Sequence, residues 1–318
     1  MAEKAFEIER RLIREFFSTN VFHIPDFQRD YKWGEDKAAK IIKEDEDVEE
    51  DEGDEFRQFL ADLKTSCEST HDTEYYIGTV ISHEEDKNKL QLIDGQQRVT
   101  SIVLILASYI MFLKETKADD DQIAEYRGII KKFYDGKKDT KILSTSDPYG
   151  EKFLKELFKK FEMPEFSKEI EIENTKNHRD TVMQCLAFFR VKRPKGYNLD
   201  FIKYILDSVV VAHVDATNFR QAFVVFERMN DRGRDLTVPD KIKYFLMKHY
   251  SYDATAFINN SSNISELWRP IADRFQSDGK FTQFLLHYFA AEHFFIDDNN
   301  WYSADKVISW FRTYCDDL

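Results

Sequence analysis

The chain has 318 residues, with 46 basic and 59 acidic side chains and a formal net charge of −13 at pH 7. A chain with this charge repels nucleic acid as a whole, so any DNA contact requires a local basic face. The hydrophobic content of 42%, with 28 Phe and 15 Tyr, excludes a disordered polypeptide, and the low counts of Gly and Pro (10 and 6) disfavour a turn-rich all-β fold. We therefore expect a folded and mainly helical protein.

The three cysteines, Cys67, Cys185 and Cys315, lie far apart and form no CxxC pair. This pattern disfavours a disulfide framework and a structural zinc site, and it predicts buried free thiols in a cytoplasmic, reducing setting. The N-terminal residues contain no signal-peptide core, and no apolar run approaches the length of a membrane span. We expect no membrane partner.

The first predicted element is a helix over residues 5–19, because Ile8, Leu12 and Phe16 share one side of it. Residues 21–34 follow, and a proline within them predicts an extended segment that leads into a loop.

Four residues of this loop, Gln28, Arg29, Tyr31 and Trp33, are suited to grip a nucleobase or a phosphate. Aromatic rings stack on bases, and Arg contacts phosphate. The alternative interpretation is that Tyr31 and Trp33 anchor the loop on the core.

Ten of the twelve residues from Glu44 to Glu55 are acidic, which predicts a solvated loop without the ligand order of an EF-hand. A helix over residues 55–66 follows. Its apolar side consists of Phe56, Phe59, Leu60 and Leu63. Asp62 faces away from most of these residues and is a candidate acid or metal-water ligand, with a solvated surface carboxylate as the alternative.

Two antiparallel strands are predicted next, over residues 75–82 and from Leu90 onward, with a polar hairpin loop at 84–89. Gly78 inside the first strand predicts that another group comes close to the backbone there. The small sheet is expected to pack against helices at 6–17, 55–66 and 97–114.

The stretch from Leu90 to Ser101 joins an apolar strand, a polar corner and the start of a helix that runs to Leu113. A strand that ends in Gly and opens directly into a helix leaves backbone N–H groups unpaired at the positive end of the helix dipole. Anions bind at such helix N-termini. The sequence therefore predicts a phosphate site at the corner from Asp94 to Arg98.

The side chains of this corner suit the same ligand. Arg98 offers a planar fork of donors for phosphate oxygens, Gln96 and Gln97 offer neutral donors or acceptors, and Asp94 can hold a magnesium-bound water. The spacing of Asp94 and Gln97 is also that of a capping box, in which two side chains close the first helical turn for stability alone. On spacing alone the capping box is the favoured interpretation.

Four helical segments are expected between residues 115 and 208, at 121–134, 150–162, 176–190 and 199–207. The most basic local patch of the chain consists of Lys131, Lys132, Lys137, Lys138 and Lys141. We interpret this patch as a solvated face, with a contact to phosphates or to a partner as the alternative.

A β-branched run at 209–214 predicts a strand that returns to the first sheet. Helices are expected over 219–229 and 239–248, and residues 253–318 are expected to be helical with aromatic packing residues. The polar turn between the first two helices contains Asn230, Arg232, Gly233 and Arg234. Two guanidinium groups in one turn give it more capacity to bind anions than a simple helix joint requires.

Three segments resemble one known family in the same order. They are IPDFQRDYKW (24–33), YYIGTVIS with LQLIDGQQRVTSIVLIL (75–106), and AFVVFERMNDRGRDLTVPDKIK (222–243). They look like the N-terminal domain of the GmrSD-type, modification-dependent restriction proteins, including the phosphorothioate-sensing SspE-like members. The DGQQR corner is close to diagnostic, and the ordered trio is stronger than any single motif.

The resemblance implies an α+β fold, with a small ParB/sulfiredoxin-like mixed sheet and extensive helical additions. The core would comprise residues 1–114 together with about 209–250, with a helical insertion at 115–208 and a C-terminal helical region at 251–318. Family members usually continue into a His-Me finger nuclease domain, and no such constellation follows residue 250. Two interpretations stay open: the chain is truncated before that domain, or the nuclease sits on another chain.

The resemblance also implies hydrolysis of a nucleoside triphosphate (GTP, ATP, CTP or UTP) with Mg²⁺, in defence against phage DNA. Asp94, Gln97 and Arg98 would be catalytic. Nucleotide contacts would come from Gln28, Arg29, Gly95, Gln96, Asn230, Arg232 and Gly233. Asp62 matches an acidic position of the family, and phosphoryl transfer needs charge neutralisation and a positioned water more than covalent help.

The leading hypothesis is a triphosphate-hydrolysing sensor and regulatory domain of a restriction system, with modified double-stranded DNA, a nuclease domain or subunit and a second copy of the chain as candidate partners. The first alternative is a non-hydrolytic adaptor that binds nucleotide or DNA in the same cleft. The second alternative is a ParB-like, metal-dependent nuclease that uses Asp62 and Asp94.

Overall fold

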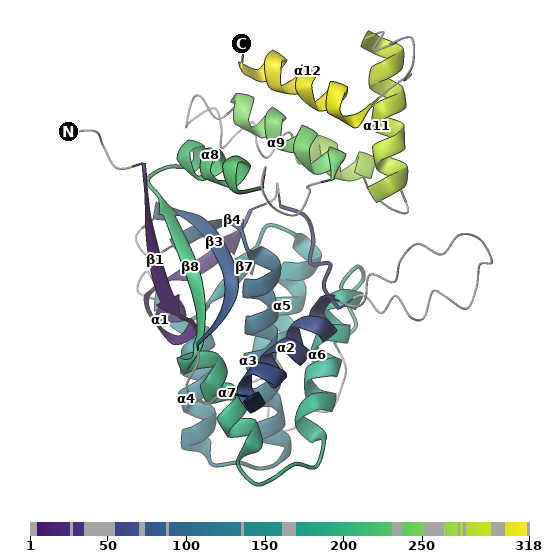
Figure 1. Cartoon of the computed structure of the whole chain (residues 1–318). Coiled ribbons are helices and arrows are strands. Elements are labelled where there is room, and N and C mark those ends of the chain that lie inside the picture. The colour runs from purple at the N-terminus through teal and green to yellow at the C-terminus, as the bar shows by residue number, and fades with distance from the viewer. Residues whose placement is uncertain are drawn as a thin grey trace. The chain divides into compact units, whose positions relative to one another are not determined.

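The computed structural model describes residues 5–25, 28–34, 55–69, 74–86, 89–134, 137–160, 170–230, 237–250, 264, 266–272, 274–275, 278–293 and 303–316. The chain forms two compact units, Met1–Thr217 and Asn218–Leu318. The first unit contains the strands and seven of the described helices, and the described elements of the second unit are helices (Figure 1).

The strands are β1 (Phe6–Leu12), β2 (Val21–Ile24), β3 (Tyr75–Asp86), β4 (Lys89–Asp94), β5 (Lys131–Tyr134), β6 (Lys137–Lys141), β7 (Leu143–Thr145) and β8 (Val209–Ala216). The helices of the first unit are α1 (Ile13–Thr19), α2 (Glu55–Ser69), α3 (Gln96–Glu115), α4 (Asp120–Ile130), α5 (Pro148–Lys160), α6 (Lys176–Arg190) and α7 (Tyr197–Asp207). Those of the second unit are α8 (Phe219–Asn230), α9 (Val238–Tyr250), α11 (Asp278–His293) and α12 (Ala304–Asp316).

Six strands form one mixed sheet in the order β1-β8-β3-β4-β2-β7. The β1–β8 and β3–β4 pairs are antiparallel, and the β8–β3, β4–β2 and β2–β7 pairs are parallel. Helices α2, α3, α5 and α6 gather to one side of this sheet (Figure 1). The predicted α+β class with a mainly helical composition is confirmed, as are the hairpin of β3 with β4 and the return of β8 to the sheet. The ParB/sulfiredoxin-like character of the sheet stays a prediction.

Helix α3 is the centre of the first unit's core. Its residues from Val99 to Leu113 are buried on every side apart from the partly exposed Phe112, and it packs against α4, α5 and α6. Of the described helices, α3 is the one that is long and apolar enough to cross a membrane, which the sequence analysis did not predict. However, 89% of its most apolar 18-residue segment is buried inside the protein. A helix that is apolar all round is typical of a protein core.

The predicted helix over residues 5–19 is wrong in its first half. Residues Phe6–Leu12 form β1, which pairs with β8 along its whole length, and the helix α1 begins only at Ile13. Ile8 is 61% exposed at this edge of the sheet, although its helical spacing to Leu12 had suggested a buried side. Tertiary pairing with a distant strand overrides local helical periodicity here.

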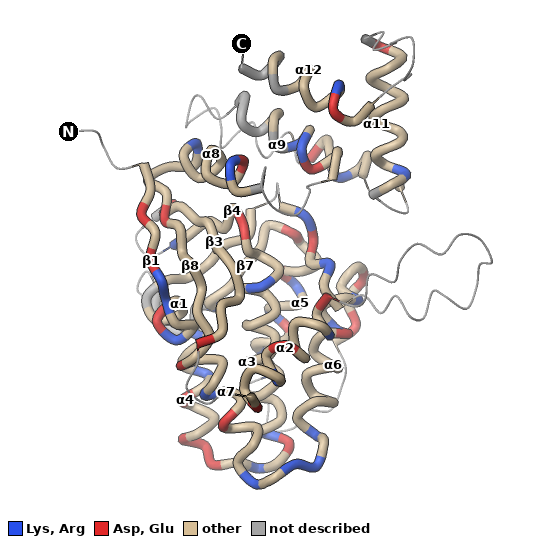
Figure 2. Tube along the Cα trace, in the orientation of Figure 1, with Lys and Arg blue, Asp and Glu red and all other residues tan. Residues whose placement is uncertain are grey.

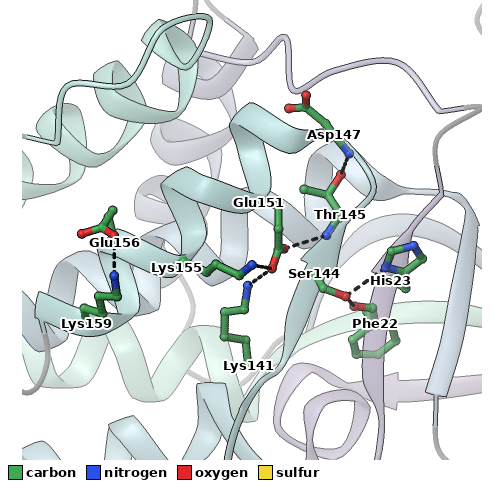
Figure 3. Close-up of polar contacts among 10 residues, drawn as sticks. All are labelled: Phe22, His23, Lys141, Ser144, Thr145, Asp147, Glu151, Lys155, Glu156 and Lys159. Atoms are coloured by element: carbon green, nitrogen blue, oxygen red, sulfur yellow. Dashed lines mark hydrogen bonds and ion pairs between the residues drawn. The ribbon is translucent and has the colours of Figure 1, made fainter. Parts of the chain in front are cut away.

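The predicted helix over residues 121–134 ends at Ile130, and β5 and β6 form a separate two-stranded sheet after it. Lys141 at the end of β6 is paired with Glu151 of α5 at 2.5 Å, and Lys155 approaches the same carboxylate at 3.6 Å (Figure 3). Burial lowers the pKa of Lys141, and the ion pair opposes this shift. Lys141 therefore fastens β6 to α5, while the side chains at 132–140 lie outside the described residues.

The edge strand β7 is also fastened by polar side chains. The imidazole of His23 on β2 is hydrogen-bonded to Ser144 Oγ through Nδ1 at 3.0 Å, and the Thr145 N–H donates to Glu151 Oε2 at 3.2 Å (Figure 3). Figure 2 shows Lys and Arg interspersed with Asp and Glu over the described part of the first unit.

Candidate functional site

The corner predicted at Asp94–Arg98 is present. Strand β4 ends at Asp94, Gly95 has a φ of +83°, and α3 begins at Gln96. A Cβ on Gly95 would lie 2.8 Å from Val80 Cγ2 and 3.1 Å from the Thr79 carbonyl oxygen of β3. Two features therefore require glycine at position 95: the left-handed backbone conformation and the close approach of the neighbouring strand.

The capping-box interpretation of Asp94 and Gln97 is wrong. The residue at the cap position is Gly95, which has no side chain to cap the helix, and the Asp94 carboxylate accepts a hydrogen bond from the Gly95 N–H at 2.7 Å. The first intrahelical bond runs from the Val99 N–H to the Gly95 carbonyl oxygen at 3.0 Å. The preceding N–H groups therefore lie at the positive end of α3 without a capping side chain.

Arg98 lies against the strand β3 at Gly78. Its Nη1 donates to the Ile77 carbonyl oxygen at 3.2 Å, and a Cβ on Gly78 would lie only 1.8 Å from the same nitrogen. Gly78 has a φ of +111°, and the pairing of β3 with β8 shifts register between Tyr76 and Thr79. The prediction that another group approaches the backbone at Gly78 is confirmed, and the group is the Arg98 guanidinium.

Opposite charges meet at Asp94. Its Oδ2 lies 3.9 Å from Arg98 Nη2, and the two side chains are 31% and 24% exposed, so that both reach solvent. Burial raises the pKa of Asp94, and Arg98, the Gly95 N–H and Arg29 oppose this rise. The charge of Arg29 also lowers the pKa of Asp94, and the Arg29 carbonyl oxygen is hydrogen-bonded to Gln96, so the backbone of Arg29 lies close to the start of α3.

The glutamines of both motifs hold the loop 28–34 in place. Gln28 Nε2 donates to the Ile93 carbonyl oxygen at 2.7 Å, and Gln96 Nε2 donates to the Arg29 carbonyl oxygen at 3.1 Å. Gln97 uses both ends of its amide: Nε2 donates to the Asp30 carbonyl oxygen at 3.1 Å, and Oε1 accepts from the Lys32 N–H at 2.9 Å.

Gln96 and Gln97 therefore bind the backbone of the loop, and Gln28 binds the end of β4. The predicted contact of these amides with a ligand stays a prediction. Gln96 Oε1 is buried and has no hydrogen-bond partner among the residues that the structure covers.

Tyr31 is not available for stacking on a base. Its side chain is 7% exposed, its hydroxyl is hydrogen-bonded to Ser101 at 2.8 Å and Thr181 at 3.2 Å, and its ring packs 4.9 Å from His178. The ring of the partly buried Trp33 packs 5.3 Å from that of Phe59 on α2. Both aromatic residues anchor the loop on the core, as the alternative interpretation held.

Asp62 lies on α2, and its contacts differ from those of the corner residues. Its carboxylate accepts a hydrogen bond from Gln58 Nε2 at 2.7 Å on α2. Burial raises the pKa of Tyr75, at the start of β3, and the charge of Asp62 raises it further. Asp94, by contrast, pairs with Ile81, six residues along β3. In the described part of the chain no contact joins Asp62 to Asp94.

The third motif lies in the second unit, where α8 and α9 confirm the two predicted helices. The side chain of Asn230 and the residues Arg232 and Gly233 lie outside the described residues. Their convergence with Arg98 stays a prediction.

Three residues that hold the first loop were missed by the sequence analysis, namely Ser101, Asn177 and Thr181. Asn177 and Thr181 are polar residues four positions apart on α6, and so share one helical face. That spacing is the signal that could have found them.

The sequence matches the family described as GmrSD restriction endonuclease, N-terminal domain, over residues 13–247. This range is nearly three quarters of the chain and contains all three motifs. No curated protein matches the sequence. The chain therefore belongs to the family of GmrSD N-terminal domains and is a component of a restriction system.

Proposed function

We propose that the corner at the start of α3 binds a nucleoside triphosphate and hydrolyses it, and that this reaction regulates the cleavage of modified DNA by a nuclease domain or subunit in the cytoplasm. The observation that carries this proposal is the pairing of Arg98 with Asp94 at the uncapped start of a 20-residue helix, where Gln96 also holds the backbone of Arg29. Guanidinium groups and helix N-termini both favour phosphate oxygens.

The residues present have distinct roles in this proposal. Arg98 and Arg29 neutralise charge on the phosphates, and the backbone N–H groups at the start of α3 add donors. Mg²⁺ is commonly held by one or two carboxylates together with substrate phosphates, and Asp94 fits as that carboxylate. The ion, when bound with the triphosphate, supplies further neutralisation and orientation of the phosphates.

One observation favours the non-hydrolytic adaptor as a second candidate. Gln97 was expected to act in catalysis, yet both ends of its amide bind the backbone of the first loop. The amide of this expected catalytic residue is therefore used to hold the loop. The metal-dependent nuclease alternative, with Asp62 and Asp94 as its carboxylates, stays a prediction.

Substitution of the two arginines tests the proposal. Arg29→Ala removes an exposed guanidinium, and Arg98→Lys keeps the charge while removing the planar fork. Each change should weaken binding of a non-hydrolysable triphosphate with Mg²⁺ by roughly 10- to 100-fold, as expected for the loss of a hydrogen bond to a charged group. Arg190→Ala is the matched control, because Arg190 forms a surface ion pair with Glu115.

Isothermal titration and circular dichroism measure affinity and folding in the same samples. Unchanged affinity in both arginine variants would overturn the proposed site. Phosphate release with and without modified DNA then separates the two candidates. Binding without turnover under both conditions selects the adaptor over the hydrolase.

A further inference from the structure

The first loop is held by a second helix that none of the sequence motifs contains. Asn177 of α6 donates from Nδ2 to the Tyr31 carbonyl oxygen at 3.1 Å and to the Lys32 carbonyl oxygen at 3.4 Å. One turn further along α6, Thr181 is hydrogen-bonded to the Tyr31 hydroxyl at 3.2 Å. The contacts therefore reach both the backbone and the side chain of the loop.

The loop packs closely against α6 at Gly34. Gly34, with a φ of +91°, sits so close to α6 that a Cβ would lie 2.3 Å from Thr181 Oγ1 and 2.7 Å from the Asn177 carbonyl oxygen. Between these two residues, His178 packs its buried ring 4.9 Å from that of Tyr31. The loop is thus fitted against one face of α6.

These contacts matter because the loop has no strand or helix of its own to fix it. From Arg29 to Trp33 its backbone is bound by side-chain amides: Gln96 and Gln97 on α3, and Asn177 on α6. The loop contacts both α3 and α6, and these two helices pack on each other. Gln96 of α3 binds the Arg29 carbonyl oxygen, and Asn177 of α6 binds the carbonyl oxygens two and three residues further on, so both helices fix the loop that carries Arg29.

We propose that Asn177 is a positioning residue of the triphosphate site, which acts through the backbone of Tyr31 and Lys32 to place the Arg29 guanidinium beside Asp94. This inference rests on the proposed function. It extends the site to a helix about 80 positions beyond the DGQQR corner.

Two variants and one control test this role. Asn177→Asp keeps the shape of the side chain but removes its N–H donors, and Asn177→Ala removes the amide. Lys176→Ala is the matched control, because Lys176 is the preceding residue and pairs with Asp180 on the surface of α6. Both Asn177 variants should bind a non-hydrolysable triphosphate with Mg²⁺ roughly tenfold more weakly, the loss typical of one net hydrogen bond, and the control should bind normally.

A double-mutant cycle with Arg29→Ala separates positioning from a general structural effect. If Asn177 acts through Arg29, the Asn177 variants weaken binding no further once Arg29 is absent. A loss of affinity that is equal with and without Arg29 overturns the proposal.

Hydrogen exchange of the backbone amides in residues 28–34, measured without nucleotide, reports on the loop directly. We expect faster exchange in both Asn177 variants than in the unmodified protein and in Lys176→Ala, and unchanged exchange overturns the proposal. Failure of the unmodified protein to bind triphosphate instead overturns the proposed function, and the exchange result still decides whether Asn177 holds the loop.

Discussion

Replacement of Gly78 by Ala tests the packing of Arg98 against β3. An added Cβ would lie 1.8 Å from Arg98 Nη1, which cannot stay in place. Because this nitrogen is the end of a long flexible side chain, we expect the guanidinium to move and the strand to stay. The variant should therefore lose the hydrogen bond from Arg98 to the Ile77 carbonyl oxygen and misplace the guanidinium that we propose to bind phosphate.

The magnitude follows from two contributions to the free energy of unfolding. A non-glycine residue at a φ of +111° costs about 1 to 3 kcal/mol of backbone strain. The lost hydrogen bond to Ile77 adds about 1 kcal/mol. A total of about 2 to 4 kcal/mol corresponds to a fall in the thermal midpoint of roughly 5 to 15 °C for a unit of this size.

Differential scanning calorimetry and urea unfolding measure this change. Gly128→Ala is the matched control: Gly128 lies within α4, and a Cβ there would have nothing within 4 Å. Alanine should stabilise that helix by roughly 0.5 to 1 kcal/mol. In the Arg98→Ala background, the penalty of Gly78→Ala should shrink to its strain contribution. Gly78→Ala with normal stability and normal triphosphate affinity would refute the reasoning.

Two further predictions concern the hydrogen bonds of Gln97 to the loop 28–34 and the buried histidines. Gln97→Ala should lower the free energy of unfolding by about 2 to 4 kcal/mol, because it leaves the loop carbonyl and N–H groups without partners; a urea midpoint that does not move would contradict this role. Burial lowers the pKa of His178 and of His213 to about 4, below the 6.5 of an exposed imidazole. Between about pH 4 and 6.5 the unfolded chain therefore binds more protons than the folded chain. The free energy of unfolding has its full value above about pH 6.5, and it falls as the pH drops to about 4, by up to roughly 3 kcal/mol for each histidine. Urea unfolding at several pH values measures how the free energy of unfolding changes with pH, and His178→Phe should reduce this change. The same pH dependence in that variant would show that His178 does not stay neutral in the folded state.

The local sequence was sufficient to predict the corner itself. An apolar strand, a glycine and a helical repeat are neighbours in the chain, and their conformations follow from short-range preferences. The same holds for the hairpin of β3 with β4 and for the close approach at Gly78. In each case the deciding interaction lies within about 20 residues along the chain.

The sequence could not decide which partners the polar side chains of the corner select. Gln97 has the right spacing for a capping box, but its amide binds the loop because that loop is folded against α3. Tyr31 is an aromatic residue of the kind that stacks on bases, but Thr181 and His178 of α6 contact it and its side chain is buried. An amide or a phenol bonds to whichever group the fold brings near, and spacing along the chain does not encode that choice.

The sequence by itself therefore determined the fold class, the family and the presence of the strand–glycine–helix corner, because these depend on composition and on contiguous motifs. Only the tertiary structure decided that residues 6–12 form an edge strand, that the glutamines hold a loop, and that Asn177 binds the same loop. These features depend on pairs of residues that are about 65 to 200 positions apart. Their partners are set by packing, which short-range periodicity does not specify.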